Sequence, residues 1–213
     1  MKILYCYAHP NEKSFNAMLK DTALQLFENH KVDIMVSDLY AMQFQALASW
    51  NDFNEDLASE SHYFLAQHTA FQQQGLSTDI TQEIEKIQWA DHLIFQFPLW
   101  WFSVPAILKG WFDRVLVKGF AYDAGKIFEN GLLQGKTASL VVTTQSPESA
   151  YQLDGVHHAT IDAFLKHIHH TLHFVGMKTL DPFVMFNAFQ LSAERTEEVV
   201  AAYQRYLQQV IMS

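Results

Sequence analysis

Tyr151 and His157 are the residues best suited to acid chemistry, and both lie in the stretch TTQSPESAYQLDGVHH at 143–158. A phenol and an imidazole that converge on one ligand can donate hydrogen bonds or a proton to a transient negative charge. The same residue types are also common at protein surfaces, so they can be ordinary side chains of a loop. The spacing indicates a candidate donor pair and leaves the surface interpretation open.

An aromatic run between two prolines is the second unusual feature. Residues 95–105 read FQFPLWWFSVP, which places Trp100, Trp101 and Phe102 side by side. Neither the alternation of a strand nor the stripe of a helix accounts for three adjacent rings flanked by proline. The rings can form a wall for a flat heterocycle, with loop amides as donors to its edge, or they can plug the core.

The stretch AHPNEKSFN at 8–16 joins an apolar run to a helical pattern. His9, Ser14 and Asn16 lie near the expected helix N-terminus, where free N–H groups and the helix dipole favour an anion such as phosphate. Ser14 and Asn16 can equally serve as helix caps. The patterns GxGxxG and GxxxxGK[ST] do not occur, which disfavours a glycine-rich dinucleotide site and a P-loop.

These stretches must be positioned by alternating strands and helices. Strand-like apolar runs cover 2–7, 32–37, 92–97, 138–144 and, weakened by Pro182, 179–185. Helical spacing covers 14–29, 79–89, 104–114, 156–174 and 192–210. The pattern predicts a parallel sheet covered on both faces, and ligands bind beyond the carboxyl ends of such strands, where all three stretches lie. Residues 38–74 show no strong period and are expected to form a surface loop with at most one short helix.

Composition limits the class of protein. The 213 residues suit one domain, 1–213, and 49% hydrophobic with 17% charged residues predicts a folded core. The net charge of −9 with only 14 Lys and Arg argues against nucleic acid as a partner. Cys6, the single cysteine, is compatible with a reducing compartment, and no export signal or apolar span of about 20 residues occurs. We therefore expect a soluble, cytoplasmic protein.

Histidines in the helical stretch 156–174 raise the question of a metal. His169 and His173 have i, i+4 spacing, but His169 and His170 are adjacent and must point in different directions on a helix. No Cys or acidic residue joins them at the spacing of a ligand set. We expect a polar helix face or a dimer surface here and no metal site.

The segment FQFPLWWFSVPAILKGWFDRV at 95–115, followed by GFAY at 119–122, resembles the NAD(P)H:quinone oxidoreductase family. This family includes mammalian DT-diaphorase and bacterial drug-activity modulator and potassium-efflux ancillary proteins. The resemblance extends to SDLYAMQF at 37–44, LSTDI at 76–80 and the two loop stretches described above. It implies an α/β, flavodoxin-like three-layer sandwich with a five-stranded parallel sheet of order 2-1-3-4-5. It also implies a homodimer with a bound flavin that passes hydride from NAD(P)H to a quinone in a ping-pong cycle.

The resemblance also implies roles for individual residues. The flavin phosphates would be held by His9, Ser14, Phe15 and Asn16, and the ribityl chain and ring by Pro98, Leu99, Trp100, Trp101 and Phe102. The opposite edge would be lined by Thr143, Thr144 and the amides of Gln145 and Ser146. Tyr151, also a cofactor contact, and His157 match the pair that stabilises negative charge on the flavin. Tyr122 and Phe174 match residues of the quinone and nicotinamide pocket, with Tyr122 reaching in from the partner subunit.

Departures from the family pattern leave several points open. Gln145 and Ser146 replace two glycines that commonly follow the Thr-Thr pair, and Ala124 stands where mammalian enzymes have a second pocket tyrosine. The resemblance favours FAD over FMN, with the adenine end near residues 60–75 and 187–196. It leaves the preference between NADH and NADPH undecided. Two alternatives remain: a flavodoxin-type electron carrier, and a regulatory flavoprotein subunit that binds a membrane potassium-efflux system.

Overall fold

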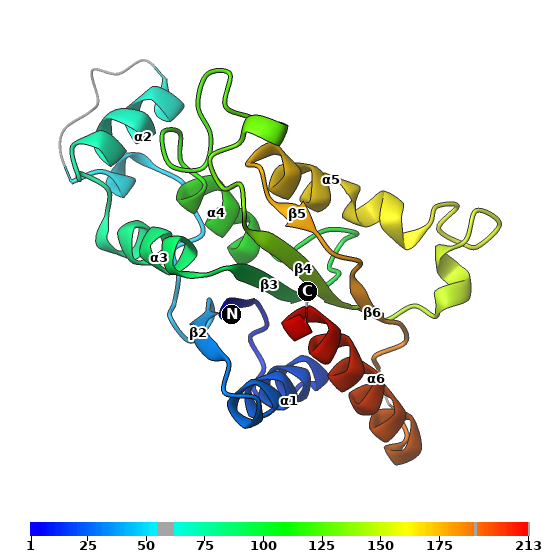
Figure 1. Cartoon of the computed structure of the whole chain (residues 1–213). Helices are drawn as coiled ribbons and strands as arrows, with labels where there is room; N and C mark the ends of the chain where they lie inside the picture. The colour runs from blue at the N-terminus through cyan, green and yellow to red at the C-terminus, as the bar shows by residue number, and fades with distance from the viewer. Residues whose placement is uncertain (55–61, 190, 213) are drawn as a thin grey trace.

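The computed structural model describes residues 1–54, 62–189 and 191–212, which form a three-layer sandwich around one parallel sheet (Figure 1). The strands are β1 (Lys2–Tyr7), β2 (Asp33–Asp38), β3 (His92–Pro98), β4 (Thr137–Thr143), β5 (Lys178–Thr179) and β6 (Phe183–Met185). The α-helices are α1 (Phe15–Asn29), α2 (Tyr63–Gln72), α3 (Thr78–Trp89), α4 (Ala106–Val115), α5 (Ile161–Phe174) and α6 (Ala193–Met212). Short 3₁₀ turns are η1 (Trp50–Asp52), η2 (Phe128–Asn130) and η3 (Glu148–Tyr151).

The sheet order β2-β1-β3-β4-β5 confirms the predicted order. The last predicted strand, 179–185, is wrong as one continuous element, because β5 and β6 pair separately with β4. Pro182 lies between them and has no N–H group to donate to the ladder. The fifth position of the sheet is therefore shared by two short strands.

Strand alternation distributes the core over both faces of the sheet. In β1, Leu4 and Cys6 pack with the core residues of α3, α4 and α5, whereas Ile3, Tyr5 and Tyr7 pack with those of α1 and α6. Figure 1 shows these two groups of helices on opposite sides of the sheet. Because both faces are covered, the carboxyl ends of the strands and the loops after them are the part left to form a site.

One helix prediction needs correction. The predicted helix 156–174 begins only at Ile161, because His158 has a positive φ of 50° that no helix residue adopts. Helix α2 lies in the segment 38–74, for which a loop with at most one short helix was expected, and residues 55–61 of that segment lie outside the described ranges. Only Ala66, Gln67 and Ala70 of α2 are buried, so its sequence carries a weak apolar stripe.

His92 makes the fold sensitive to acid. Its ring is fully buried, with Nδ1 2.6 Å from Thr137 Oγ1 and Nε2 2.9 Å from Ser139 Oγ. Burial lowers the pKa of His92 from 6.5 to about 4. The unfolded chain therefore takes up this proton first as pH falls, so stability is full above pH 6.5 and is lost on the way down to about pH 4. A shift of this size corresponds to about 3 kcal/mol.

Urea unfolding between pH 7.5 and pH 4 checks this expectation. The variant His92→Gln should show a flatter loss of unfolding free energy over that range than the natural chain, because Gln does not titrate. His30→Gln, at the exposed C-terminal cap of α1, is the matched control. An acid dependence of His92→Gln equal to that of the natural chain would contradict the assignment.

Candidate functional site

A cleft of about 680 Å³ opens at the carboxyl ends of β1, β3 and β4. Its lining residues are His9, Asn11, Ser14, Phe15, Asn16, Pro98, Leu99, Trp100, Trp101, Phe102, Thr143, Thr144, Gln145, Ser146, Tyr151, His157, Ala188 and Phe189. The structure thus brings every residue that the sequence assigned to a cofactor, and His157, into one cleft. Asn11 was not singled out, and Ala188 and Phe189 were included only as part of the region 187–196 expected near an adenine end.

The turn between β1 and α1 forms one end of the cleft. Ser14 is the N-cap of α1, and its Oγ accepts a hydrogen bond from the N–H of Ala17 at 3.1 Å. His9 Nδ1 accepts from the N–H of Asn11 at 3.1 Å, and burial lowers the pKa of His9. Capping therefore accounts for Ser14 but not for Asn16, whose side chain donates to Thr143 Oγ1 at 2.8 Å. The helix terminus keeps unpaired N–H groups that favour an anion.

The aromatic run forms a tight hairpin turn. Trp100 and Ser103 exchange two backbone hydrogen bonds of 3.0 Å, and the central residues Trp101 and Phe102 have φ values of 49° and 61°. Positive φ at both positions is the pattern of a type I′ turn, which normally selects Asn or Gly. Trp101 is 93% exposed, so the core-plug interpretation fails for this ring. The turn presents aromatic faces at the cleft at a cost in backbone strain.

The loop after β4 brings the predicted donor pair together. Tyr151 is 5% exposed, and its ring centroid lies 4.8 Å from that of His157, which excludes a pair of freely solvated surface residues. The backbone N–H of His157 donates to Ala150 O at 3.2 Å. Its Nε2 lies 3.3 Å from Ser146 Oγ, and its ring meets Phe102 edge-on at 5.2 Å. Contacts from three directions thus hold the imidazole at the cleft.

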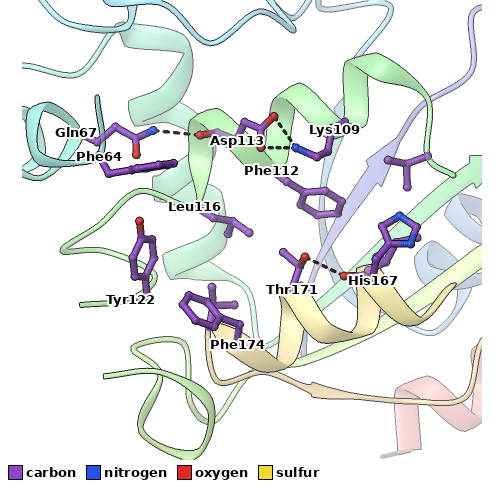
Figure 2. A pocket seen from close by; sticks show the side chains of 13 residues that line it. Phe64, Gln67, Lys109, Phe112, Asp113, Leu116, Tyr122, His167, Thr171 and Phe174 are labelled. Carbon is purple, nitrogen blue, oxygen red and sulfur yellow. Dashed lines mark hydrogen bonds and ion pairs between the residues drawn. The ribbon is translucent and has the colours of Figure 1, made fainter. Parts of the chain in front are cut away.

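Tyr122 and Phe174 line a different pocket, of about 260 Å³, between α2, α4 and α5. Figure 2 shows their rings facing Phe64 and Leu116 across this pocket, and the two ring centroids lie 5.4 Å apart. Lys109 and Asp113 form an ion pair on α4 at its rim (Figure 2). Within one chain, therefore, Tyr122 and Phe174 are grouped with each other and do not line the cleft.

Other classes of site find little support in the part of the chain that the structure describes. There, no three His, Cys, Asp or Glu side chains gather as a set of metal ligands would. His173 packs edge-on against Phe128 at 5.3 Å, and its Nε2 lies 3.7 Å from a carboxylate oxygen of Glu129. Over the same ranges, no helix combines the length and the apolar character needed to cross a membrane.

Comparison with known proteins decides the family. A family model described as the flavodoxin-like fold matches residues 1–210. Ribosyldihydronicotinamide dehydrogenase (quinone) from Pongo abelii is 44% identical over 98% of this chain and 91% of its own length. The chain belongs to the flavodoxin-like quinone dehydrogenase family. NAD(P)H dehydrogenase (quinone) 1 from Cavia porcellus is 36% identical over 98% of this chain and 77% of its own length.

A solved structure supports the same family. The putative quinone reductase from Klebsiella pneumoniae superposes on this chain with a TM-score of 0.94 and 37% identity, covering 99% of this chain and 85% of the other. In the loop after β4, Gln145 and Ser146 stand where quinone dehydrogenases are expected to have two glycines. The backbone of Ser146 is held by hydrogen bonds. Its carbonyl accepts from Thr144 Oγ1 at 2.8 Å and from the N–H of Asn187 at 3.0 Å. The replacement adds a hydroxyl at the cleft, and this Oγ lies 3.3 Å from Nε2 of His157.

Proposed function

We propose that this chain is a flavin-dependent NAD(P)H:quinone oxidoreductase that transfers two electrons in a ping-pong cycle. The observation that carries the proposal is the single cleft in which a helix N-terminus, an aromatic wall and the Tyr151–His157 pair converge. A bound flavin would supply hydride transfer from NAD(P)H to a quinone. The names of the relatives, quinone dehydrogenases and a quinone reductase, support this reaction.

The residues present fit a flavin. The N-terminus of α1, capped by Ser14, offers backbone N–H groups for phosphate, and the turn at Trp100, Trp101 and Phe102 offers a flat apolar face for the ring. Gln145 and Ser146 line the cleft from the other side, and their amides would be donors for the polar edge of the ring. A planar, polar-edged and phosphorylated cofactor matches these three surfaces together.

Tyr151 and His157 would act as donors fixed before the reaction starts. Hydride arrival on a flavin increases negative charge on the pyrimidine side of the ring, and donors already aimed there lower the barrier. Burial holds the Tyr151 phenol, and Ser146 and Phe102 hold the imidazole. Little rearrangement is then needed during the transfer.

We place Tyr122 and Phe174 over the cleft of a partner subunit in a homodimer. Their pocket lies apart from the cleft of their own chain, and apolar rings around it suit burial against another surface. Light scattering should give the mass of a dimer. Tyr122→Ala should raise the KM for the quinone and leave the flavin Kd unchanged, and a monomer with full activity would remove this part of the proposal.

FAD is the cofactor we favour. The cleft lining includes Ala188 and Phe189, and Phe189, which is 62% exposed, would offer an adenine a stacking face. The part of the expected adenine region at 60–61 and 190 lies outside the described residues. Mass spectrometry of the cofactor released on denaturation separates FAD from FMN.

Steady-state kinetics tests the proposed activity. Initial rates at several quinone concentrations should give parallel double-reciprocal lines, as a ping-pong cycle requires. NADH, NADPH and dihydronicotinamide riboside should be compared as donors, because the names of the relatives mention different ones. Absence of turnover with all three would favour an electron carrier, and co-purification with a transporter would favour the regulatory alternative.

Trp101→Asn should stabilise the flavin-free protein and weaken flavin binding. Asn tolerates positive φ better than Trp, and the 93% exposed ring loses almost no packing, so we expect a gain of about 1 kcal/mol in unfolding free energy. Loss of the stacking face should raise the flavin Kd by about tenfold. Urea unfolding and fluorescence titration measure the two effects.

Leu153→Asn is the matched control for Trp101→Asn. Leu153 is also a large apolar side chain, 77% exposed, but it does not belong to the set of residues that line the cleft. This variant should change neither the stability nor the flavin Kd. An unchanged flavin Kd in Trp101→Asn would show that the ring does not contact the cofactor.

A further inference from the structure

A row of buried polar side chains runs beneath the cleft, on the face of the sheet that α1 and α6 cover. Its members come from α6, β1, β3, α1 and β4, in the order Tyr203, Tyr5, Gln96, Asn16 and Thr143. All are between 0% and 5% exposed. Only the last two line the cleft, so the row connects the interior of the protein to the cleft floor.

The first half of the row has a fixed direction. Gln96 Nε2 lies 2.7 Å from the backbone oxygen of Asn16, which can only accept, so the amide nitrogen of Gln96 faces Asn16. Its Oε1 then faces Tyr5 and accepts the hydroxyl hydrogen of Tyr5. Because Tyr5 has no second hydrogen, its oxygen accepts from Tyr203 at 2.8 Å. The backbone carbonyl of Asn16 thus sets the direction of the hydrogen bonds from Tyr5 to Gln96 and from Tyr203 to Tyr5.

The second half ends at the cleft. Gln96 Nε2 also lies 3.4 Å from Asn16 Oδ1, so the side-chain oxygen of Asn16 faces Gln96 and Asn16 Nδ2 faces Thr143. This Nδ2 donates to Thr143 Oγ1 at 2.8 Å. An amide nitrogen cannot accept, so the hydroxyl hydrogen of Thr143 must point elsewhere. Among the described residues, no protein acceptor takes it.

We infer that Gln96 is a positioning residue that makes the Thr143 hydroxyl a hydrogen-bond donor to an acceptor atom of the flavin. This inference rests on the proposed function, because it takes the flavin as the occupant of the cleft. Gln96 acts through Asn16. It fixes which end of the Asn16 amide meets Thr143, and that end decides whether the Thr143 hydroxyl accepts or donates the hydrogen bond between them. Bonds in such a row polarise one another, which strengthens the terminal donor.

Flavin binding to the apo-protein, followed by quenching of flavin fluorescence, tests the terminal donor. Thr143→Val keeps the shape of the side chain and removes the hydroxyl, and it should raise the flavin Kd by about tenfold, the effect of one lost hydrogen bond. Thr143→Ser should restore most of the affinity. Ser139→Ala is the matched control, because it removes a buried hydroxyl on the same strand that bonds His92 away from the cleft.

A double-mutant cycle tests the role of Gln96. The side chain of Gln96→Glu has one hydrogen to donate at most, whereas the amide has two. The side-chain amide of Asn16 is then free to turn, and the flavin Kd should rise about as much as in Thr143→Val. The double variant should bind flavin about as weakly as either single variant, because both changes remove the same donated hydrogen. Should Gln96→Glu fail to fold, Asn16→Asp serves in its place, since the cycle cancels the effect of its charge.

Three results would overturn the inference. Unchanged affinity in Thr143→Val would show that the hydroxyl does not donate to the flavin. In the second result, the double variant loses flavin affinity by the product of the two single losses, and the apo-protein melts at a lower temperature. Gln96 would then be a structural residue only. If the natural chain itself takes up no flavin, the proposed function fails first, and this outcome is distinct from the other two.

Discussion

Replacing Tyr151 with phenylalanine and His157 with phenylalanine in one variant should slow the bleaching of bound flavin by NAD(P)H by about 10³-fold. Both changes keep an aromatic ring in a place where rings already pack, since Tyr151 and His157 lie 4.8 Å apart and His157 meets Phe102 at 5.2 Å. They remove the phenol and imidazole donors that would stabilise charge on the flavin. Flavin affinity should change far less than the rate, because the aromatic wall and the phosphate end are untouched.

Rapid mixing of the flavin-loaded variant with NAD(P)H measures this rate. His158→Asn is the control: it removes the neighbouring imidazole, and Asn tolerates the positive φ of 50° at that position. The control should bleach at the natural rate. A double variant that bleaches within about threefold of the natural chain would show that neither donor takes part, since such donors contribute at least 10²-fold in other enzymes.

Arg114→Met should destabilise the fold by about 3–5 kcal/mol, because it leaves a buried charge without its partner. Arg114 is 2% exposed, and its guanidinium lies 2.9 Å from Asp52 and 2.5 Å from Asp79 and donates to Gln45 O at 2.8 Å. Burial opposes the charge, but the hydrogen bonds that the guanidinium donates to Asp79 and Asp52 hold the pKa of Arg114 above its usual value. Asp52 is 1% exposed and would lose its cation in the variant, keeping the hydrogen bonds from the Tyr63 hydroxyl and the N–H of Ser49.

Urea unfolding at neutral pH measures this loss, and the same helix supplies the control. Lys109 pairs with Asp113 at 2.5 Å on α4, but the two side chains are 59% and 46% exposed. Lys109→Met should therefore cost less than about 1 kcal/mol. Equal losses for the two variants would show that burial of the Arg114 pairs does not determine their contribution.

Much of the fold follows from local patterns in the sequence. The apolar run 2–7 is β1 without any shift, and the carboxyl-end rule for parallel sheets places the three candidate stretches at one cleft. Departures occur where a single residue overrides the pattern. Pro182 interrupts the last strand, and the positive φ of His158 delays the start of α5.

Tertiary contacts account for what the sequence could not predict. In the sequence, nothing distinguishes Tyr5 and Gln96 from other strand residues. Only the pairing of β1 with β3 brings their side chains together. Trp101 and Phe102 disfavour a type I′ turn, so propensity alone argues against the observed geometry. The resemblance assigned Tyr122 to the pocket of a partner subunit; within one chain it lies apart from the cleft, and its place across a dimer stays a prediction.

Anaerobic stopped-flow absorbance is the most direct test of the central claim, that a flavin in this cleft passes electrons from NAD(P)H to a quinone. NAD(P)H should bleach the visible band of the bound flavin, and a second mixing with a quinone should restore it. Both steps should be at least as fast as steady-state turnover. A protein that takes up neither FAD nor FMN, or a bound flavin that NAD(P)H fails to bleach, would show that this cleft does not carry electrons from NAD(P)H to a quinone.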